Sequence, residues 1–172
     1  MMHHLSRVFH RACLVLLLAL TLTARPVSAQ DRIGRDSGLP IPRFVTLGSS
    51  KVFMRSGPGK EFPIKWVYAR KGLPLLVIEE SEDWRLLEDP DGEQGWIHTS
   101  LLAGKRTLMV RGAVAQLHRT PTTQSLVLAL VEPGVIADLL NCQPDWCLVD
   151  IGDRRGWLAR DGVWGVLDGE SF

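Results

Sequence analysis

The side chains best suited to thiol chemistry are Cys142 and Cys147, the two cysteines that follow residue 30. A cysteine nucleophile needs a free thiol beside a histidine, and the chain offers only His98 and His118 after that point, far apart in sequence. A zinc site needs four ligands, and redox pairs usually read Cys-x-x-Cys, so neither use fits. We therefore expect a structural disulfide across the turn that contains Pro144.

Other catalytic patterns are missing from the sequence. It contains no Gly-x-Ser-x-Gly elbow for a serine nucleophile and no His-Glu-x-x-His spacing for a metal. Adjacent carboxylates occur at Glu79-Glu80 and at Glu88-Asp89, in segments typical of turns, and we interpret them as solvated surface charge. The sequence thus predicts no catalytic residue, no metal site and no cofactor, and we expect that the chain is not an enzyme.

The N-terminus has the features of a secretory signal peptide. Arg7 and Arg11 precede an apolar run, Leu14–Leu22, and residues 28–30, Ser-Ala-Gln, offer a cleavage junction. The apolar run is shorter than the roughly 20 residues that a membrane-spanning helix needs. We therefore expect cleavage after Ala29 and a periplasmic or secreted chain without a membrane span.

Charge argues against nucleic acid as a partner. Removing residues 1–29 takes away three arginines and no acid, which leaves 17 basic and 19 acidic side chains and a net charge of −2. A nearly neutral chain without a Lys/Arg cluster lacks the charge pattern of nucleic-acid-binding proteins.

Two stretches of the chain, Asp83–Ile97 and Asp145–Leu158, have nearly the same sequence. Each begins Asp-Trp, turns through Asp and Gly, and resumes at Gly-Trp followed by an aliphatic residue. The first tryptophans of the two copies lie 62 residues apart and the second ones 61 apart. Because solenoid repeats mostly run about 20–50 residues, this period favours the duplication of a small domain.

Short apolar runs separated by turn signals surround both copies, and almost nothing has helical periodicity. In the first unit we expect strands over 51–54, 66–69, 75–78, 84–87 and 95–98, and a single helical turn over 99–102. In the second unit we expect strands over 114–117, 127–131, 135–140, 146–149 and 156–158, with residues 105–111 as a strand that crosses between the units. Five short strands per unit favour a small barrel.

The sequence therefore predicts an all-β chain with two tandem barrels. The expected parts are a signal peptide over 1–29, a linker over 30–43, a first repeat over 44–104 and a second over 105–172. A unit of about 60 residues buries little surface and is only marginally stable alone. Packing the two units together, with a disulfide in one, would offset that.

The motifs of the first unit resemble those of bacterial SH3-like (SH3b) domains. Members of that family carry an N/M-x-R-x-G-P turn, a W-x-x-V strand and a closing G-W-V strand. Met54–Pro58, Trp84–Leu87 and Gly95–Ile97 fill the three motifs in order.

The second unit matches this pattern less completely. Trp146–Val149 and Gly156–Leu158 keep the later motifs, whereas His118–Pro121 departs from the first. The whole is similar to exported alphaproteobacterial proteins with two SH3-like repeats and a Gly-Leu-Pro-x-Pro-Arg lead-in, here Gly38–Arg43.

This resemblance implies a shallow groove between the first loop and the second hairpin. On that model we predict Arg55, Tyr68, Trp84 and Trp96 as binding residues, because aromatic rings suit extended peptides and arginine can pair with a ligand carboxylate. Under the other interpretation the tryptophans pack the barrel and Arg55 braces its own loop. Because only the first unit keeps the loop motif, our hypothesis is that it binds and that the second unit stabilises it.

We expect a non-catalytic exported binding module that engages peptidoglycan or a periplasmic protein or peptide. The alternative is a structural subunit of an envelope complex without a small ligand. SH3-like repeats often accompany cell-wall hydrolases, but we expect the two units to leave no room for a catalytic domain within these 172 residues.

Overall fold

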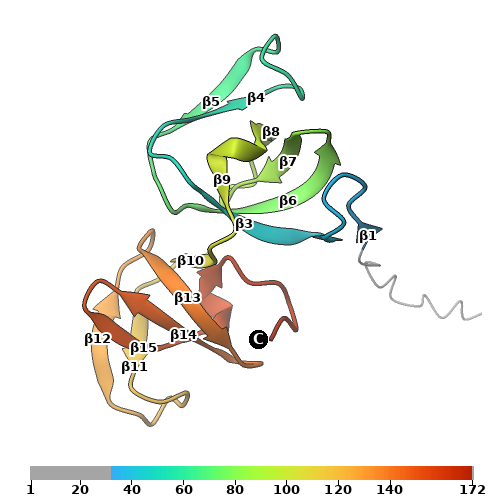
Figure 1. Cartoon of the computed structure of the whole chain (residues 1–172). Helices are drawn as coiled ribbons and strands as arrows, with labels where there is room; N and C mark the ends of the chain where they lie inside the picture. The colour runs from blue at the N-terminus through green and yellow to red at the C-terminus, as the bar shows by residue number, and fades with distance from the viewer. Residues whose placement is uncertain (1–31, 172) are drawn as a thin grey trace, which may run out of the picture. The chain divides into compact units, whose positions relative to one another are not determined.

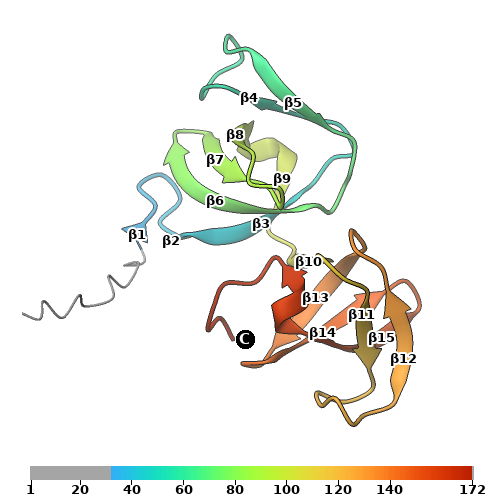
Figure 2. The same cartoon turned by 180° about the vertical axis from the view of Figure 1, so that it is seen from behind.

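The structure is a computed structural model that describes residues 32–171, and it is nearly all β (Figures 1 and 2). It contains two seven-stranded sheets, each forming one small barrel, and one two-stranded sheet. The predicted all-β fold with two tandem barrels is confirmed. The signal peptide predicted for residues 1–29 lies outside the described residues.

Barrel one is formed by residues 43–103. Its elements are β3 (Arg43–Leu47), β4 (Val52–Arg55), β5 (Ile64–Tyr68), β6 (Pro74–Ser81), β7 (Trp84–Glu88), β8 (Gln94–His98), the 3-10 turn η1 (Thr99–Leu101) and β9 (Leu102–Ala103). The strand order in the sheet is β5-β4-β8-β7-β6-β3-β9.

Barrel two, residues 107–164, repeats this architecture strand for strand. Its elements are β10 (Thr107–Val110), β11 (Ala115–His118), β12 (Val127–Val131), β13 (Ile136–Cys142), β14 (Trp146–Ile151), β15 (Arg154–Ala159), η2 (Arg160–Gly162) and β16 (Val163–Trp164). The order β12-β11-β15-β14-β13-β10-β16 is that of barrel one with each strand replaced by its equivalent. The sequence duplication is therefore a duplication of the whole barrel.

Barrel one has two strands more than the five expected, and barrel two has one more than the expected five together with the strand over 105–111. In barrel one β3 pairs with both β6 and β9, and in barrel two β10 pairs with both β13 and β16. Residues 105–111, which were expected to cross between the units, thus contain β10, the first strand of the second sheet in chain order. β9 and β16 have two residues each, which is too short for the alternating pattern that reveals a strand in sequence.

Aliphatic side chains fill both barrels. Leu87 and Ile97 are fully buried in barrel one, as are Val149 and Leu158 in barrel two. The hairpin tryptophans, Trp84, Trp96, Trp146 and Trp157, are only half-buried on the outer face, because side chains alternate between the two faces of a strand. These rings are available for contacts outside the core.

In both barrels a glycine lets two neighbouring strands approach closely. A Cβ on Gly95 would lie 2.5 Å from Met54 Cγ and 2.8 Å from the carbonyl oxygen of Arg55. A Cβ on Gly156 would lie 2.7 Å from Leu117 Cγ and 2.8 Å from the His118 carbonyl oxygen. The glycine of the Gly-Trp motif therefore marks the position where β8 contacts β4, and where β15 contacts β11.

The segment expected as a linker is instead folded onto barrel one. β1 (Arg32–Ile33) pairs with β2 (Pro40–Ile41), and the turn between them binds the carboxylate of Glu80. Ser37 donates to it from its backbone N–H at 3.0 Å and from its hydroxyl at 2.5 Å. The carboxylate also pairs with Arg43 at 2.8 Å and with Arg85 at 3.4 Å.

Glu80 corrects the interpretation of the Glu79-Glu80 pair as solvated charge. Glu79 is exposed, whereas the Glu80 side chain is 1% exposed. Burial by itself raises the pKa of Glu80, but the hydrogen bonds from Ser37 and the Arg43 and Arg85 guanidinium groups outweigh it and lower that pKa to about 2.

Barrel two uses a covalent bond at the same cross-strand position. Glu80 is the register partner of Arg85, and Cys142, 62 residues further on, is the register partner of Cys147. A disulfide joins the two cysteines, as the sequence predicts. An ion pair in one barrel and a disulfide in the other thus link the same two strands.

The two barrels form one compact unit with shared packing. The Trp164 indole N–H donates to the Pro74 carbonyl oxygen at 3.1 Å, and its ring meets that of Phe44 edge-on at 5.1 Å. Met109 and Ile136 of barrel two pack against the core of barrel one. In the described part of the chain the helical segments are 3-10 turns of three residues, so none could cross a bilayer.

Gly95→Ala should lower the free energy of unfolding by about 1–3 kcal/mol, because the new methyl group overlaps backbone as well as side-chain atoms. Urea unfolding followed by tryptophan fluorescence measures the change. Gly104→Ala is the matched control, since a Cβ there meets nothing within 4 Å. Equal stability of the two variants would contradict the close-approach argument.

Glu80→Gln should remove an acid-sensitive part of the stability. Because the folded pKa is about 2, below the ordinary value for glutamate, the carboxylate stabilises the fold above about pH 4.5 and this contribution disappears as the pH falls toward 2. At about 1.4 kcal/mol per pKa unit, the contribution amounts to about 3 kcal/mol. Unfolding curves between pH 2 and pH 7 should slope less for Glu80→Gln than for wild type or for Glu79→Gln, and parallel curves would refute the assignment.

Candidate functional site

The candidate site is a groove on barrel one, with a cavity of about 270 Å³. It is lined by Phe53 and Arg55 of β4, Lys60 of the following loop, Trp84 at the start of β7, His98 at the end of β8, and Ser100 and Leu101 of η1. The groove therefore lies between the first loop and the second hairpin, where the resemblance places it.

Trp84 and His98 form one wall of this groove. They are register partners on β7 and β8, and their rings meet edge-on at 5.3 Å. His98 Nδ1 accepts the Ser100 backbone N–H at 3.2 Å and lies 2.8 Å from the Ser100 hydroxyl oxygen. The imidazole thus caps η1, and in the neutral ring this arrangement leaves the proton on Nε2.

Arg55 braces its own loop and also lines the groove. Its guanidinium donates to the Phe62 carbonyl oxygen at 2.7 Å and so braces the loop, while the side chain also lines the groove. A guanidinium has five N–H donors, so one such bond leaves others for a ligand carboxylate. Lys60, exposed on the same loop, adds a second cation.

Trp96 and Tyr68, which the sequence also suggested, do not line the cavity. Trp96 is half-buried beside Leu86, its register partner. Tyr68 is 6% exposed and its hydroxyl donates to Asp89 Oδ2 at 2.8 Å. The structure thus places Tyr68, predicted as a binding residue, in the core of barrel one and not in the groove.

Tyr68 and Asp89 instead form a buried structural pair. Asp89 is 5% exposed and accepts the backbone N–H groups of Asp91 and Glu93 at 2.9 Å each, which shapes the β7–β8 turn. Burial, followed by the hydrogen bond to Asp89, raises the pKa of the Tyr68 hydroxyl. Asp89 is therefore not the solvated charge that its sequence neighbourhood indicated.

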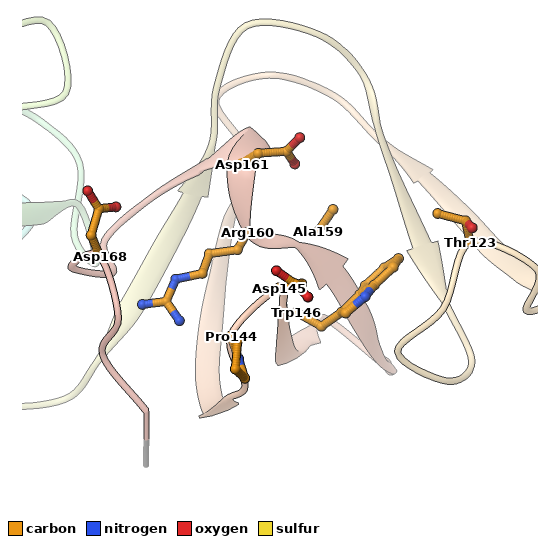
Figure 3. Close-up of a pocket in the computed structure, with 8 residues that line it drawn as sticks. All are labelled: Thr123, Pro144, Asp145, Trp146, Ala159, Arg160, Asp161 and Asp168. Carbon is orange, nitrogen blue, oxygen red and sulfur yellow. The ribbon is translucent and has the colours of Figure 1, made fainter.

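Barrel two contains an equivalent groove that the loop motif did not reveal. Trp146 stands at the position of Trp84, and His118, at the position of Arg55, meets it edge-on at 5.2 Å. A cavity of about 490 Å³ lies beside Trp146 (Figure 3). The repeated Asp-Trp at residues 145–146 was the available signal.

No metal centre is evident in the part of the chain that the structure describes. Within residues 32–171 no three His, Cys, Asp or Glu side chains gather closely enough to hold an ion.

Both barrels match a known family model. The bacterial SH3 domain matches residues 48–104 and again residues 112–165, together more than half of the chain. The chain belongs to the bacterial SH3 domain family. Its duplicated hairpins are thus parts of two successive bacterial SH3 domains.

A curated relative of these bacterial SH3 domains comes from Bacillus subtilis (strain 168), where it is named as a candidate N-acetylmuramoyl-L-alanine amidase, YrvJ. It is 21% identical over 128 residues, which cover 68% of this chain and 24% of the relative. The chain therefore spans about a quarter of the length of the curated relative that it matches.

Two solved structures from Trichomonas vaginalis are also similar. NlpC2 matches at 12% identity with a TM-score of 0.35, over 74% of this chain and 51% of its own. NlpC1 matches at 10% identity with a TM-score of 0.34, over 76% and 48%.

Tyr68→Phe should lower stability by about 1–3 kcal/mol, because it leaves Asp89 Oδ2 buried without its donor. Ligand binding by the folded protein should be unchanged, since the hydroxyl does not reach the groove. Chemical unfolding measures the first effect and a binding assay below the unfolding transition measures the second. A loss of binding without a loss of stability would instead indicate that the Tyr68 hydroxyl contacts the ligand.

Proposed function

We propose that this chain is an exported, non-catalytic binding module whose barrel-one groove holds a cell-wall peptide by its carboxylate. The observation that carries the proposal is the pairing of Arg55 and Lys60 with the ring of Trp84 around one cavity that has no lining carboxylate. Guanidinium and ammonium groups attract a carboxylate, and aromatic rings pack against an extended peptide backbone.

A cell-wall source for this peptide is favoured by chemistry and by family. Stem peptides of peptidoglycan are short, extended and rich in carboxylates, which suits a shallow cationic groove. Membership of the bacterial SH3 domain family supports a binding role. The name of the Bacillus subtilis relative refers to an N-acetylmuramoyl-L-alanine linkage, a part of the cell wall.

We propose no catalytic role for this groove, because its one Ser–His contact has a structural explanation. Ser100 presents both its hydroxyl and its backbone N–H to the same nitrogen of His98, as a helix cap does. A nucleophilic serine needs a base that is oriented by a third group. The ring that this imidazole meets, edge-on at 5.3 Å, is that of Trp84 and supplies no carboxylate.

A scaffold role in an envelope complex is the second candidate, and the edge strands favour it. β5 and β12 each end a sheet, and both expose apolar side chains. Trp66 is 53% exposed on β5, and Leu130 is 67% exposed on β12. Unpaired strand edges of this kind can add a strand from a partner protein.

A pelleting assay with purified peptidoglycan sacculi tests the proposal. Residues 30–172 should sediment with the sacculi, and Arg55→Ala/Trp84→Ala should remain in the supernatant. Lys60→Glu, which changes groove charge without touching the core, should reduce the pelleted fraction several-fold. Lys71→Glu is the matched control, an equal charge change at an exposed turn outside the groove, and it should pellet like wild type.

Two outcomes would refute a cell-wall ligand in this groove. One is the failure of wild type to pellet, in which case co-purification from the periplasm should identify the protein partner of a scaffold. The other is pelleting of Lys60→Glu and Arg55→Ala/Trp84→Ala as efficiently as wild type.

A further inference from the structure

We propose that the groove of barrel two is a second binding site, opposite in charge to the first, which takes an extended peptide that carries an ammonium group. This site lies outside the barrel-one groove of the proposed function. The proposal rests on the shape of the groove, on its carboxylates and on the comparison of the two barrels.

The groove runs along both sides of Trp146. The cavity of about 490 Å³ and a neighbouring cavity of about 510 Å³ share Thr123, Trp146, Ala159 and Asp161 as lining residues. Each is larger than the cavity of about 270 Å³ described in barrel one. Figure 3 shows the Trp146 ring lying across the pocket toward Thr123, with the Asp145 carboxylate beside it. An extended peptide can follow this groove, with a side chain over the indole.

Three carboxylates make the first of these cavities anionic. Asp145, Asp161 and Asp168 all line it and are all exposed. Within residues 32–171 none of these three side chains forms an ion pair or a hydrogen bond. Their charges therefore stay available to a ligand in the groove.

The one lining cation is already committed to the fold. The Arg160 guanidinium donates to the carbonyl oxygens of Gln143 at 2.9 Å, Glu170 at 2.7 Å and Leu167. In Figure 3 this side chain extends away from the Trp146 ring. A second arginine, Arg111, lines only the neighbouring cavity, so the groove has an anionic part and a part with an exposed cation.

Comparison with barrel one shows which residues differ between the two grooves at equivalent positions. Ala159 is the register partner of Trp146, where barrel one has His98 opposite Trp84. In barrel two an alanine thus replaces that imidazole, and His118, where barrel one has Arg55, meets the indole edge-on instead. An ammonium group over an indole gains a cation–π contact, and the carboxylates add attraction that salt weakens.

The test is an NMR titration of ¹⁵N-labelled residues 30–172 with three capped tripeptides. Acetyl-Ala-Lys-Ala-amide carries the ammonium group, acetyl-Ala-norleucine-Ala-amide has the same stem without the charge, and acetyl-Ala-Glu-Ala-amide has the opposite charge. The indole N–H signals of Trp146 and Trp84, assigned with single Trp→Phe variants, report on the two grooves separately. The lysine peptide should shift Trp146 more than Trp84.

Removing the carboxylates should weaken that binding. Asp145→Asn/Asp161→Asn/Asp168→Asn should bind the lysine peptide about tenfold less tightly, since exposed charge pairs each contribute modestly. Asp153→Asn is the matched control, because its carboxylate is 94% exposed in the β14–β15 turn and outside both cavities. Raising the salt from 50 to 500 mM should weaken binding to wild type, a test that needs no variant.

The inference fails if the norleucine or glutamate peptide shifts Trp146 as much as the lysine peptide, or if the triple variant binds as wild type does. It also fails if no peptide moves Trp146. Because the sacculus assay reports on Arg55 and Lys60 of barrel one, a failure here with intact pelleting would reject the second site alone.

Discussion

The close approach of two strands at a glycine is the constraint on which each barrel depends. At Gly95 the backbone of β8 passes so near to β4 that no side chain fits between them. This contact joins the β4–β5 hairpin to β8, and it also brings Arg55 on β4 and His98 on β8 to the rim of one cavity. Gly156 makes the same contact in barrel two. The same strand contact thus shapes both the barrel and its groove.

A second position shows that one structural requirement can be met by different chemistry. Each barrel must hold the strands β6 and β7, or β13 and β14, together near their connecting turn. Barrel one uses the buried Glu80–Arg85 pair, which also binds the N-terminal segment through Ser37. Barrel two uses the Cys142–Cys147 disulfide. The ion pair depends on pH and on its neighbours, whereas the covalent bond depends on oxidation.

The outer faces have diverged more than the cores have. Both barrels keep aliphatic interiors and a half-buried tryptophan beside a groove. The charged residues that line these cavities are basic in barrel one, whereas in barrel two they are three aspartates and one arginine. Because these side chains lie on the surface, they change charge without disturbing the packing. Duplication has therefore supplied two similar grooves with different electrostatic character.

The sequence by itself determined the all-β class, the duplication and the disulfide, because period-two alternation, turn residues and paired cysteines are local signals. It also indicated Arg55 and Trp84, which lie in recognisable motifs. Only the tertiary structure decided that Tyr68 and Asp89 are buried together, 21 residues apart, and that Glu80 is buried against the segment taken for a linker. The burial of a polar side chain depends on which distant strand faces it, and no local pattern records that contact.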